Sequence, residues 1–543
     1  MSCDSSARSS IRQVTTRAER PVGRDPDHPP LTRPDHRMGV ESVADGHHLC
    51  MASEHVATDL PVPSVRWSRG ADSVSSLLRD APLPAIASRR FATMTFDATQ
   101  ATGGPAAMAP MALSPLMPPA ASTGPALPDA ASQRLTELLA ALSVVLDSAE
   151  RRPEGHALRT AYLGARIAAQ LSLPDDRRST LLYAGLLTDI GTIGPDADPD
   201  PDVTRSRRAS LSRYRRDTTP AHLSRPHRAR AVVATLGLPV AIAEAVATAD
   251  EHWDGRGPAH TRGDRIPRDG RLLALASAVA RMGPTAADAD VRTGPAAMAA
   301  DIDRMLRVER GRSLDPGLVD EVLRMGRAGL WAELAAPSLL ERLLELEPHD
   351  TIRWTHDRHL DAVAVAFADV VDTRTPRMGR HGRRVAAFAV RTGTELGLDS
   401  RVLTDLRRAA LLHDIGKLLV PIATLEKPAE LTEAERRVVD EHARVGAAVL
   451  ARSRAFARLA PLTVAHHERL DGNGMFPAAV DESVALAARV VALSDRYEAM
   501  TAERPYRPLL SPPQVWSILD EVVGEPMARI ALRALRRAVV DAD

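Results

Sequence analysis

The stretch ALLHDIGKLLVP, from Ala410 to Pro421, places three ionisable side chains inside an apolar run with helical spacing. A buried carboxylate or ammonium is costly unless an opposite charge holds it. The pattern therefore predicts either a network of ion pairs or a bound metal ion at His413, Asp414 and Lys417. The other polar residues of the chain must decide between these alternatives.

A larger set of potential metal ligands surrounds this stretch in the sequence, and it contains no cysteine. Nitrogen and oxygen donors suit iron or manganese first, with zinc and nickel also compatible, and seven donors exceed the needs of one ion. We therefore expect two divalent ions, bridged by the two oxygens of Asp414. If helical, His466 and His467 point about 100° apart, so they should serve different ions or lie at a helix end. The set is His381, His413, Asp414, His442, His466, His467 and Asp495.

These donors must be positioned by helices. Apolar residues recur at intervals of three and four from about residue 131 almost to the C-terminus, and aromatic residues make up only 3% of the chain. This periodicity and composition predict an all-α protein. Residues 1–130 are instead rich in Pro, Ser, Asp, Arg and Ala without sustained periodicity, which predicts a disordered region or a linker.

An internal repeat indicates the architecture of the helical part. The segment that begins HALRTAYLGARIAAQ at His156 resembles the segment that begins HGRRVAAFAVRTGTE at His381, and in both 32 residues separate that histidine from the residue before DIG. The similarity continues downstream, where ATADEHWDGRG parallels VAHHERLDGNG. Self-similarity of this length predicts two copies of one helical domain. We call residues 131–350 repeat one and residues 351–543 repeat two.

The two repeats differ at their polar positions. Repeat one retains His156, Asp189 and His227, which are too few donors for two metal ions. We therefore expect a degenerate domain that packs against repeat two or regulates it. At the remaining positions repeat one carries Thr188 in place of His413, Ala249 and Asp250 in place of His466 and His467, and Ser277 in place of Asp495.

Composition limits the possible partners and the compartment. Lys+Arg and Asp+Glu both number 70, so overall charge favours neither a nucleic-acid nor a membrane partner. The one strong basic cluster, Arg205 to Asp217, is either a solvated insertion loop, which we favour, or a nucleotide or nucleic-acid patch. The two cysteines, Cys3 and Cys50, exclude a disulfide framework and fit the reducing cytoplasm. No apolar run is long enough to predict a transmembrane helix.

The motifs of repeat two resemble those of an HD-GYP domain, a subfamily of the HD superfamily of metal-dependent phosphohydrolases. The similarity covers roughly 355–525, with a degenerate echo over 131–345. His381, His413, Asp414 and Asp495 match any HD domain, while His442 and the His466-His467 pair match this subfamily. The motifs are HDIGK (413–417), KPAELT (427–432), EHARVG (441–446), HHERLDGNG (466–474), SDRYEAM (494–500) and RPYR (504–507).

The resemblance implies tandem HD-type helical bundles whose second copy cleaves a cyclic dinucleotide, cyclic di-GMP, to linear pGpG and GMP. It implies that the seven donors bind the metals and that Lys417 contacts substrate phosphate. Lys417 and Lys427 are the only lysines of the chain, and Lys427 is expected to be structural. Arg504 and Arg507 are further candidates for phosphate binding or for structural ion pairs.

Two departures from the family pattern bear on specificity. Met475 and Phe476 replace the Tyr-Pro of the family motif, which leaves the nucleotide open. Arg377 occupies the position where some members carry a glutamate for a third metal, so two metals are expected. Two rival functions therefore remain: a non-catalytic module that senses a nucleotide or binds a protein, and a phosphohydrolase acting on another nucleotide. A homodimer is compatible with the sequence.

Overall fold

The computed structural model describes helices in both repeats. The residues described are 133–193, 224–282, 295–334, 336, 338–374, 379–427, 429–467, 482–502, 510–524 and 526–540. Over this part of the chain the regular elements are all helical, apart from two isolated β-bridges. The all-α prediction is confirmed. The region 1–130 and the basic run 205–217 lie outside the described residues, so the predictions for them stay predictions.

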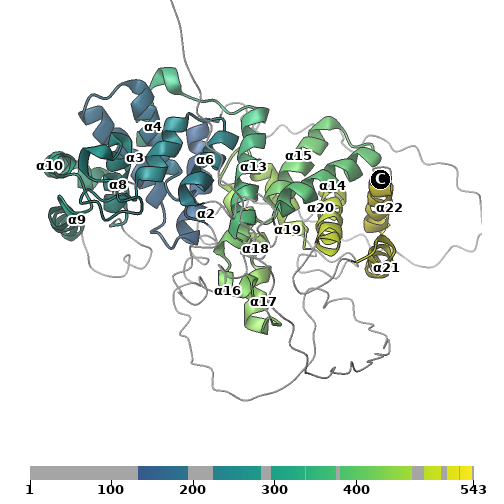
Figure 1. The fold of residues 1–543 in the computed structure, drawn as a ribbon. Helices are drawn as coiled ribbons and strands as arrows, with labels where there is room; N and C mark the ends of the chain where they lie inside the picture. The colour runs from purple at the N-terminus through teal and green to yellow at the C-terminus, as the bar shows by residue number, and fades with distance from the viewer. Residues whose placement is uncertain are drawn as a thin grey trace, which may run out of the picture. The chain divides into compact units, whose positions relative to one another are not determined.

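Within its described residues, repeat one contains eight helices of nine or more residues and several shorter ones, drawn in blue to teal in Figure 1. The longer helices are α2 (Leu135–Ala149), α3 (His156–Gln170), α4 (Asp175–Leu186), α6 (Arg225–Thr235), α7 (Val240–Thr248), α8 (Arg268–Ala280), α9 (Pro295–Glu309) and α10 (Pro316–Met325). The repeat closes with η5 (Gly326–Leu330), α11 (Trp331–Leu334), α12 (Leu339–Leu346) and η6 (His349–Thr351), while η3 (Gly263–Arg265) precedes α8.

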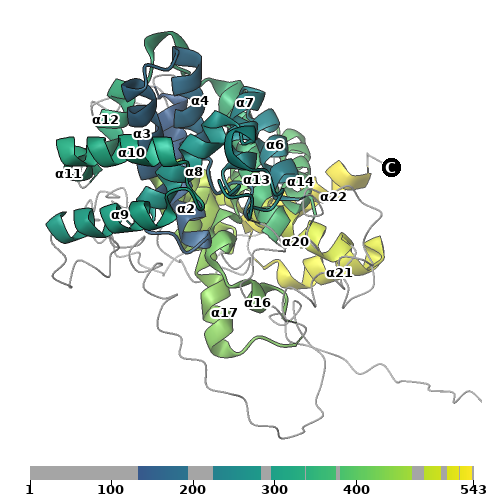
Figure 2. The same ribbon diagram turned by 60° about the vertical axis from the view of Figure 1, so that its left-hand side comes forward.

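Repeat two follows in green to yellow (Figures 1 and 2). It begins with α13 (Asp357–Arg374), α14 (His381–Glu395), α15 (Ser400–Leu412), η8 (Ile415–Leu419), α16 (Ile422–Leu425) and α17 (Glu433–Asp440). It ends with α18 (His442–Ala451), η9 (Ala457–Leu459), α19 (Ala460–Ala465), α20 (Glu482–Thr501), α21 (Pro512–Val522) and α22 (Pro526–Val540).

The helices of the two repeats pair in the same way. Helix α3 packs on α4 and α8, and its counterpart α14 packs on α15 and α20. Apolar residues at intervals of three and four form the buried faces, as Val385 and Ala389 do in α14. Both α3 and α14 begin at a histidine that follows a residue with left-handed backbone, Gly155 in one and Arg380 in the other. The common packing places corresponding helix ends around one point in each repeat.

The apolar run around the His-Asp pair is not one continuous helix, in contrast to its helical spacing in the sequence. Helix α15 ends at Leu412, and a 3-10 helix begins again at Ile415. Asp414 lies in the break with φ −98° and ψ 7°. A helix C-terminus leaves backbone carbonyls unpaired, so side chains near the break can use them. His413 uses the carbonyl of Ala410 in this way.

Several contacts join helices of repeat one to helices of repeat two. Helix α2 contacts α18 and η8, and α13 contacts α6. The side-chain amide oxygen of Gln133, which is 3% exposed, accepts hydrogen bonds from Ala455 N (2.9 Å) and Ser453 Oγ (3.3 Å). Arg454 forms an ion pair with Glu137 at 2.6 Å. None of the described helices combines the length and the apolar character needed to cross a bilayer.

Candidate metal centre

The seven predicted donors of repeat two lie together, and each is positioned at or near the end of a helix or on α20. His381 is the first residue of α14, and His442 is the first residue of α18. His413 follows the last residue of α15, and His466 follows the last residue of α19. Asp495 lies within α20. Helix ends converge here because α14 packs on α15 and α20, and α18 packs on η8 and α19.

Backbone carbonyls set the orientation of three imidazole rings. Nδ1 of His413 donates to the carbonyl oxygen of Ala410 at 2.7 Å. His442 and His466 make the same bond, to Val439 and Thr463 respectively. Each acceptor lies three residues before its histidine, in the preceding helical segment or turn. Because Nδ1 carries the proton in this arrangement, Nε2 keeps its lone pair and is free to bind a metal ion.

One group of donors consists of His381, His413 and Asp495, whose ligand atoms all lie within 4.8 Å of one another. Nε2 of His381 is 3.1 Å from Oδ1 of Asp495, and Nε2 of His413 is 3.8 Å from the same oxygen. The side chain of Asp495 is 23% exposed, whereas both imidazoles are at most 2% exposed. This group therefore has one side open to solvent.

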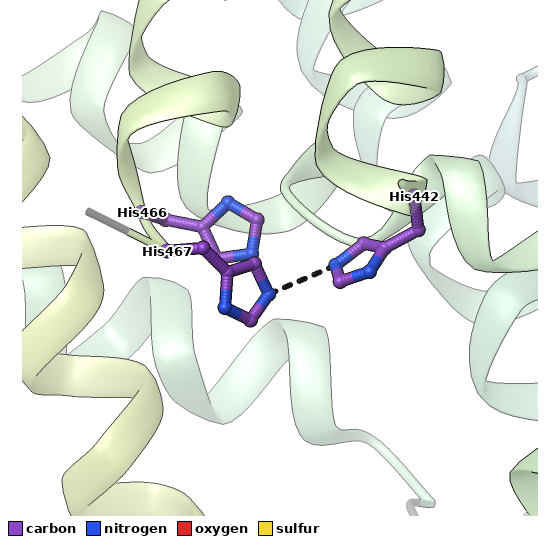
Figure 3. Close-up of side chains that lie close together, drawn as sticks. All are labelled: His442, His466 and His467. Atoms are coloured by element: carbon purple, nitrogen blue, oxygen red, sulfur yellow. Dashed lines mark hydrogen bonds between the residues drawn. The ribbon is translucent and has the colours of Figure 1, made fainter. Parts of the chain in front are cut away.

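A second group consists of His442, His466 and His467, again within 4.8 Å (Figure 3). Nε2 of His467 is 3.1 Å from Nε2 of His442, and the ring centroids of His466 and His467 are 4.1 Å apart. Helix α19 ends at Ala465, so the two adjacent histidines lie at a helix end, one of the two arrangements expected. Both of their rings nevertheless belong to the same group of donors.

Asp414 lies between the two groups. Its Oδ2 is 3.3 Å from Nε2 of His413 and 3.6 Å from Nε2 of His381. Its Oδ1 is 3.2 Å from Nε2 of His442. One carboxylate thus presents one oxygen to each group, which is the geometry needed for a bridging ligand.

The chemistry of these side chains fits metal ions better than it fits an ion-pair network. Four buried ligand atoms make no hydrogen bond within the described structure: Nε2 of His381, Nε2 of His413, Nε2 of His466 and Oδ1 of Asp414. Buried polar atoms without partners are rare and costly. Nitrogen and oxygen atoms without hydrogen-bond partners that converge in this way form a suitable site for divalent cations.

Electrostatics distinguishes the two groups. Burial alone lowers the pKa of His381, but the neighbouring carboxylates of Asp495 and Glu498 outweigh it and raise the pKa to about 10. Burial also opposes the charged form of His413, yet Asp414 raises its pKa. In the second group, burial and then His442 lower the pKa of His467 to about 3, and burial and then His467 lower the pKa of His466. When no metal is bound, His381 is therefore protonated at neutral pH, whereas His466 and His467 are neutral.

The two lysines occupy different settings. Nζ of Lys417 lies 2.7 Å from Oδ2 of Asp414, and its side chain is 18% exposed. It is therefore beside the donor cluster and accessible from solvent. Lys427 forms an ion pair with Glu435 at 2.6 Å, and Glu435 completes the capping box of α17 with Thr432. The role of Lys427 in the described structure is to fix the start of α17.

Glu498 is part of the site, although the sequence pattern did not single it out. It is 1% exposed and accepts hydrogen bonds from Nδ1 of His381 and from Arg384. A carboxylate on the distal nitrogen of a ligating histidine fixes the tautomer and the ring orientation. Its spacing contained the signal, because Glu498 lies three residues after Asp495 and therefore on the same face of α20. The remaining predicted positions, Arg377, Met475, Phe476, Arg504 and Arg507, lie outside the described residues.

Repeat one has lost this constellation. Nε2 of His156 still lies 3.6 Å from Oδ2 of Asp189, and Ser277 Oγ is 3.4 Å from the same imidazole nitrogen. His227 is exposed and pairs with Ser224 Oγ at 2.7 Å. Among the described residues, the groups of three or more donors that can hold a metal ion all belong to repeat two.

Comparison with known proteins agrees with the fold and the repeat. The model of the HD domain family matches residues 137–299 and 366–525. The chain is 29% identical over 449 residues to the 3′3′-cGAMP-specific phosphodiesterase 3 of Vibrio cholerae, covering 75% of this chain and 94% of that protein. It is 37% identical over 174 residues to the cyclic di-GMP phosphodiesterase response regulator RpfG of Xanthomonas campestris, covering 31% of this chain and 46% of the relative.

A solved structure shows the same arrangement. The cyclic GMP-AMP-specific phosphodiesterase V-cGAP3 of Vibrio cholerae is similar with a TM-score of 0.51 and 26% identity, covering 75% of this chain and 98% of that one. Two matches to one family model, over two segments related by an internal repeat, account for both halves of the helical region. The chain belongs to the HD domain family of metal-dependent phosphohydrolases, in a tandem arrangement.

Proposed function

We propose that repeat two hydrolyses a phosphodiester bond of a cyclic dinucleotide at a centre of two divalent metal ions. His381, His413 and Asp495 would hold one ion, and His442, His466 and His467 the other, with Asp414 shared between them. The observation that carries this proposal is the position of Asp414, whose two oxygens face separate groups of buried imidazole nitrogens. Iron or manganese suits these donors best, while zinc and nickel remain compatible.

The residues of the chain have defined tasks in this proposal. A pair of divalent ions, when bound, supplies a hydroxide at neutral pH and neutralises charge on phosphate oxygens. The backbone bonds of His413, His442 and His466 keep their Nε2 atoms directed at the centre. Lys417, beside Asp414 and partly exposed, would donate to a phosphate oxygen as charge grows on it in the transition state. Arg504 and Arg507 are proposed to contribute to the same phosphate contact.

The substrate is proposed from the relatives and from the chemistry of the centre. Similar proteins are named as cyclic di-GMP phosphodiesterases or as 3′3′-cGAMP-specific phosphodiesterases. The relative that this chain covers to 94% of its length is named for cGAMP, which makes cGAMP a candidate beside cyclic di-GMP. Met475 and Phe476, in place of Tyr-Pro, fall in the motif that the family resemblance connects with nucleotide choice.

The test is turnover by the purified, metal-loaded chain of cyclic di-GMP, 3′3′-cGAMP and a generic phosphodiester, with products separated by chromatography. Replacing both His413 and Asp414 by alanine should remove the bound metal and reduce turnover below detection. His227→Ala is the matched control, because this histidine is exposed in repeat one and should leave activity unchanged.

The pattern of turnover and metal content distinguishes the alternative functions. Hydrolysis of the generic diester alone would indicate a phosphohydrolase with another nucleotide substrate. Metal content without any turnover would support a non-catalytic sensing module. Full activity in the double variant would show that the active centre lies elsewhere.

Repeat one is proposed to pack against repeat two as a non-metal domain. The contacts of α2 with η8 and α18 support this, because η8 carries Lys417 and α18 begins at His442. A displacement of α2 would therefore act directly on elements that position the centre.

A further inference from the structure

The degenerate repeat contains a cavity. It has a volume of about 1030 Å³ and lies where the metal centre lies in repeat two, since Thr188, Asp189, Asp250 and Ser277 all line it. Ligand pockets usually measure about 300–1,000 Å³, so this cavity can accept a small molecule. In repeat one, a cavity therefore lies at the position where repeat two has its metal-ligand cluster.

Three arginine side chains, each at or near the end of a different helix, line this cavity. Arg152 follows α2, Arg225 begins α6, and Arg281 directly follows α8, and all three line the cavity. Two of these arginines differ in charge from the residues at the equivalent positions of repeat two. Arg225 stands two residues before His227, where Asp440 stands before His442, and Arg281 follows Ser277 by four residues, where Ala499 follows Asp495. Arg225 and Arg281 are thus specific to repeat one, whereas Arg152 has the same spacing from His156 as Arg377 has from His381.

Carboxylates pair with only some of the donor groups of these three arginines. Arg152 pairs with Asp189 at 3.2 Å, and Arg225 pairs with Asp250. Arg281 donates to Ser277 Oγ at 3.3 Å, and the described residues offer it no ion pair. The Nε atoms of Arg152 and Arg225 are buried and have no hydrogen-bond partner within the described structure. Donors therefore remain for an additional acceptor.

Most of the acidic residues that line the cavity are engaged, although Oδ2 of Asp189 makes no hydrogen bond within the described structure. The carboxylate of Glu251 accepts from the backbone nitrogens of Ala259 (2.7 Å) and Thr261 (3.0 Å), and Glu309 accepts from Ser313 Oγ at 2.6 Å. Burial lowers the pKa of Arg225 to about 10, and burial and then Arg152 lower the pKa of Arg281. Burial thus disfavours the charged form of these guanidinium groups, and a bound anion would stabilise that form.

The rest of the lining is apolar. Ala274, Ala278, Met282, Met305 and Leu314 form this side of the cavity. Methionine side chains adapt to flat aromatic rings and contact them favourably. Arginine recognises phosphate through several parallel hydrogen bonds. A cavity with guanidinium groups on one side and apolar side chains on the other matches a molecule that joins a phosphate to an aromatic base.

We propose that the cavity of repeat one binds a nucleoside phosphate without a metal ion, through Arg281, Arg225 and Arg152. The formal charges of its four arginines and four carboxylates balance, which favours one or two phosphates over a polyanion such as nucleic acid. The site is separate from the metal centre. Its existence does not depend on the catalytic activity proposed for repeat two.

The test uses the full chain with Asp414→Ala, in a buffer with a chelator, so that metal-dependent binding at repeat two is absent. GMP, AMP, guanosine and inorganic phosphate are titrated by calorimetry. GMP or AMP should bind saturably and guanosine far more weakly. Arg281→Gln should weaken nucleotide binding about ten-fold or more, the effect of losing one charge-assisted hydrogen bond. Arg324→Gln is the matched control, since this arginine is exposed on α10 and should leave affinity unchanged.

A second variant guards against a folding defect. Ala278→Phe fills the cavity without changing charge, and it should abolish binding while circular dichroism shows an unchanged helix content. Absence of saturable binding by both GMP and AMP overturns the proposal. So does nucleotide binding that survives Arg281→Gln and Ala278→Phe but is lost on Lys417→Gln, because the nucleotide would then occupy repeat two.

Discussion

At the scale of single residues, the centre depends on which imidazole nitrogen carries the proton. His413, His442 and His466 use a carbonyl three residues earlier, whereas Nδ1 of His381 is directed at a side chain on another helix. Glu498 supplies the acceptor instead and is itself held by Arg384. The same outcome, an Nε2 directed at the centre, is thus reached by backbone at three positions and by a buried carboxylate at the fourth.

Replacing Glu498 by glutamine tests this role. The amide keeps the size of the side chain but removes the negative charge that favours the Nδ1-protonated imidazole. We expect metal affinity to fall by about 10- to 100-fold, the usual effect of losing such a partner. Elemental analysis and activity as a function of added metal measure the change, and excess metal should restore turnover. Glu395→Gln, on the exposed side of α14, is the control. Unchanged metal affinity would refute the positioning role.

Metal binding should also depend on pH differently in the two groups. Without metal, the pKa of His381 is raised to about 10, so it carries a proton at pH 7 that a metal must displace, and the raised pKa of His413 acts in the same direction. Binding there releases protons, so its affinity should rise as the pH increases from 6.5 to 8.5. His466 and His467 have lowered pKa values and are already neutral, so a metal displaces no proton from these two imidazoles over this range.

Calorimetric titration of Mn²⁺ in two buffers with different ionisation enthalpies counts the released protons. The expected result is that one binding event releases more protons than the other. Equal proton release from both sites would contradict the assigned difference between the groups.

At the scale of elements, the close approach of η8 and α18 sets the distance between Asp414 and His442. Gly416 lies in η8, and a Cβ atom there would be 2.0 Å from the carbonyl oxygen of His442 and 2.8 Å from Gly446 N. Real Cβ atoms do not approach backbone so closely, so only glycine permits this contact. The bridging position of Asp414 depends on it.

Gly416→Ala should therefore separate η8 from α18. We expect a loss of about 1–3 kcal/mol in the free energy of unfolding, the usual cost of overpacking, together with weaker metal binding. Chemical denaturation and elemental analysis measure the two effects. Gly317→Ala, at the start of α10, is the control because its Cβ would meet only ordinary contacts. A variant with wild-type metal content would show that the spacing of these two elements does not control the centre.

At the scale of the whole molecule, the described residues of both repeats fall within a single compact unit. Gln133 forms one joint, that is, a set of hydrogen bonds between the two repeats. Its amide oxygen accepts hydrogen bonds from Ser453 and Ala455, and its backbone oxygen accepts one from Thr355 N at 2.9 Å. Helix α2 starts just after this residue and reaches η8. The connection runs from repeat one to the segment that bears Lys417.

Gln133→Ala should weaken this joint. It leaves the buried N–H of Ala455 without its acceptor, which costs about 1–3 kcal/mol. We expect a lower unfolding temperature and a scanning-calorimetry profile that begins to resolve two transitions. Arg454→Gln removes only a half-exposed ion pair and should change stability by about 1 kcal/mol or less. Equal effects of the two variants would mean that the buried hydrogen bonds do not hold this joint.

The sequence by itself determined the all-α class, the tandem repeat and the identity of the candidate ligands. Helical periodicity is a local property, and the equal spacing from His156 to Asp189 and from His381 to Asp414 is visible without coordinates. The break of the helix at Asp414 escaped this reasoning, because the apolar pattern continues through it.

Only the tertiary structure decided how the ligands divide into groups around Asp414, and that Glu498 supports His381. It alone placed Arg152, Arg225 and Arg281, which are far apart in the chain, around one cavity. The physical reason is the same in each case. Spacing along a helix specifies which face a residue occupies, but which helix ends meet depends on packing between elements that are distant in the sequence.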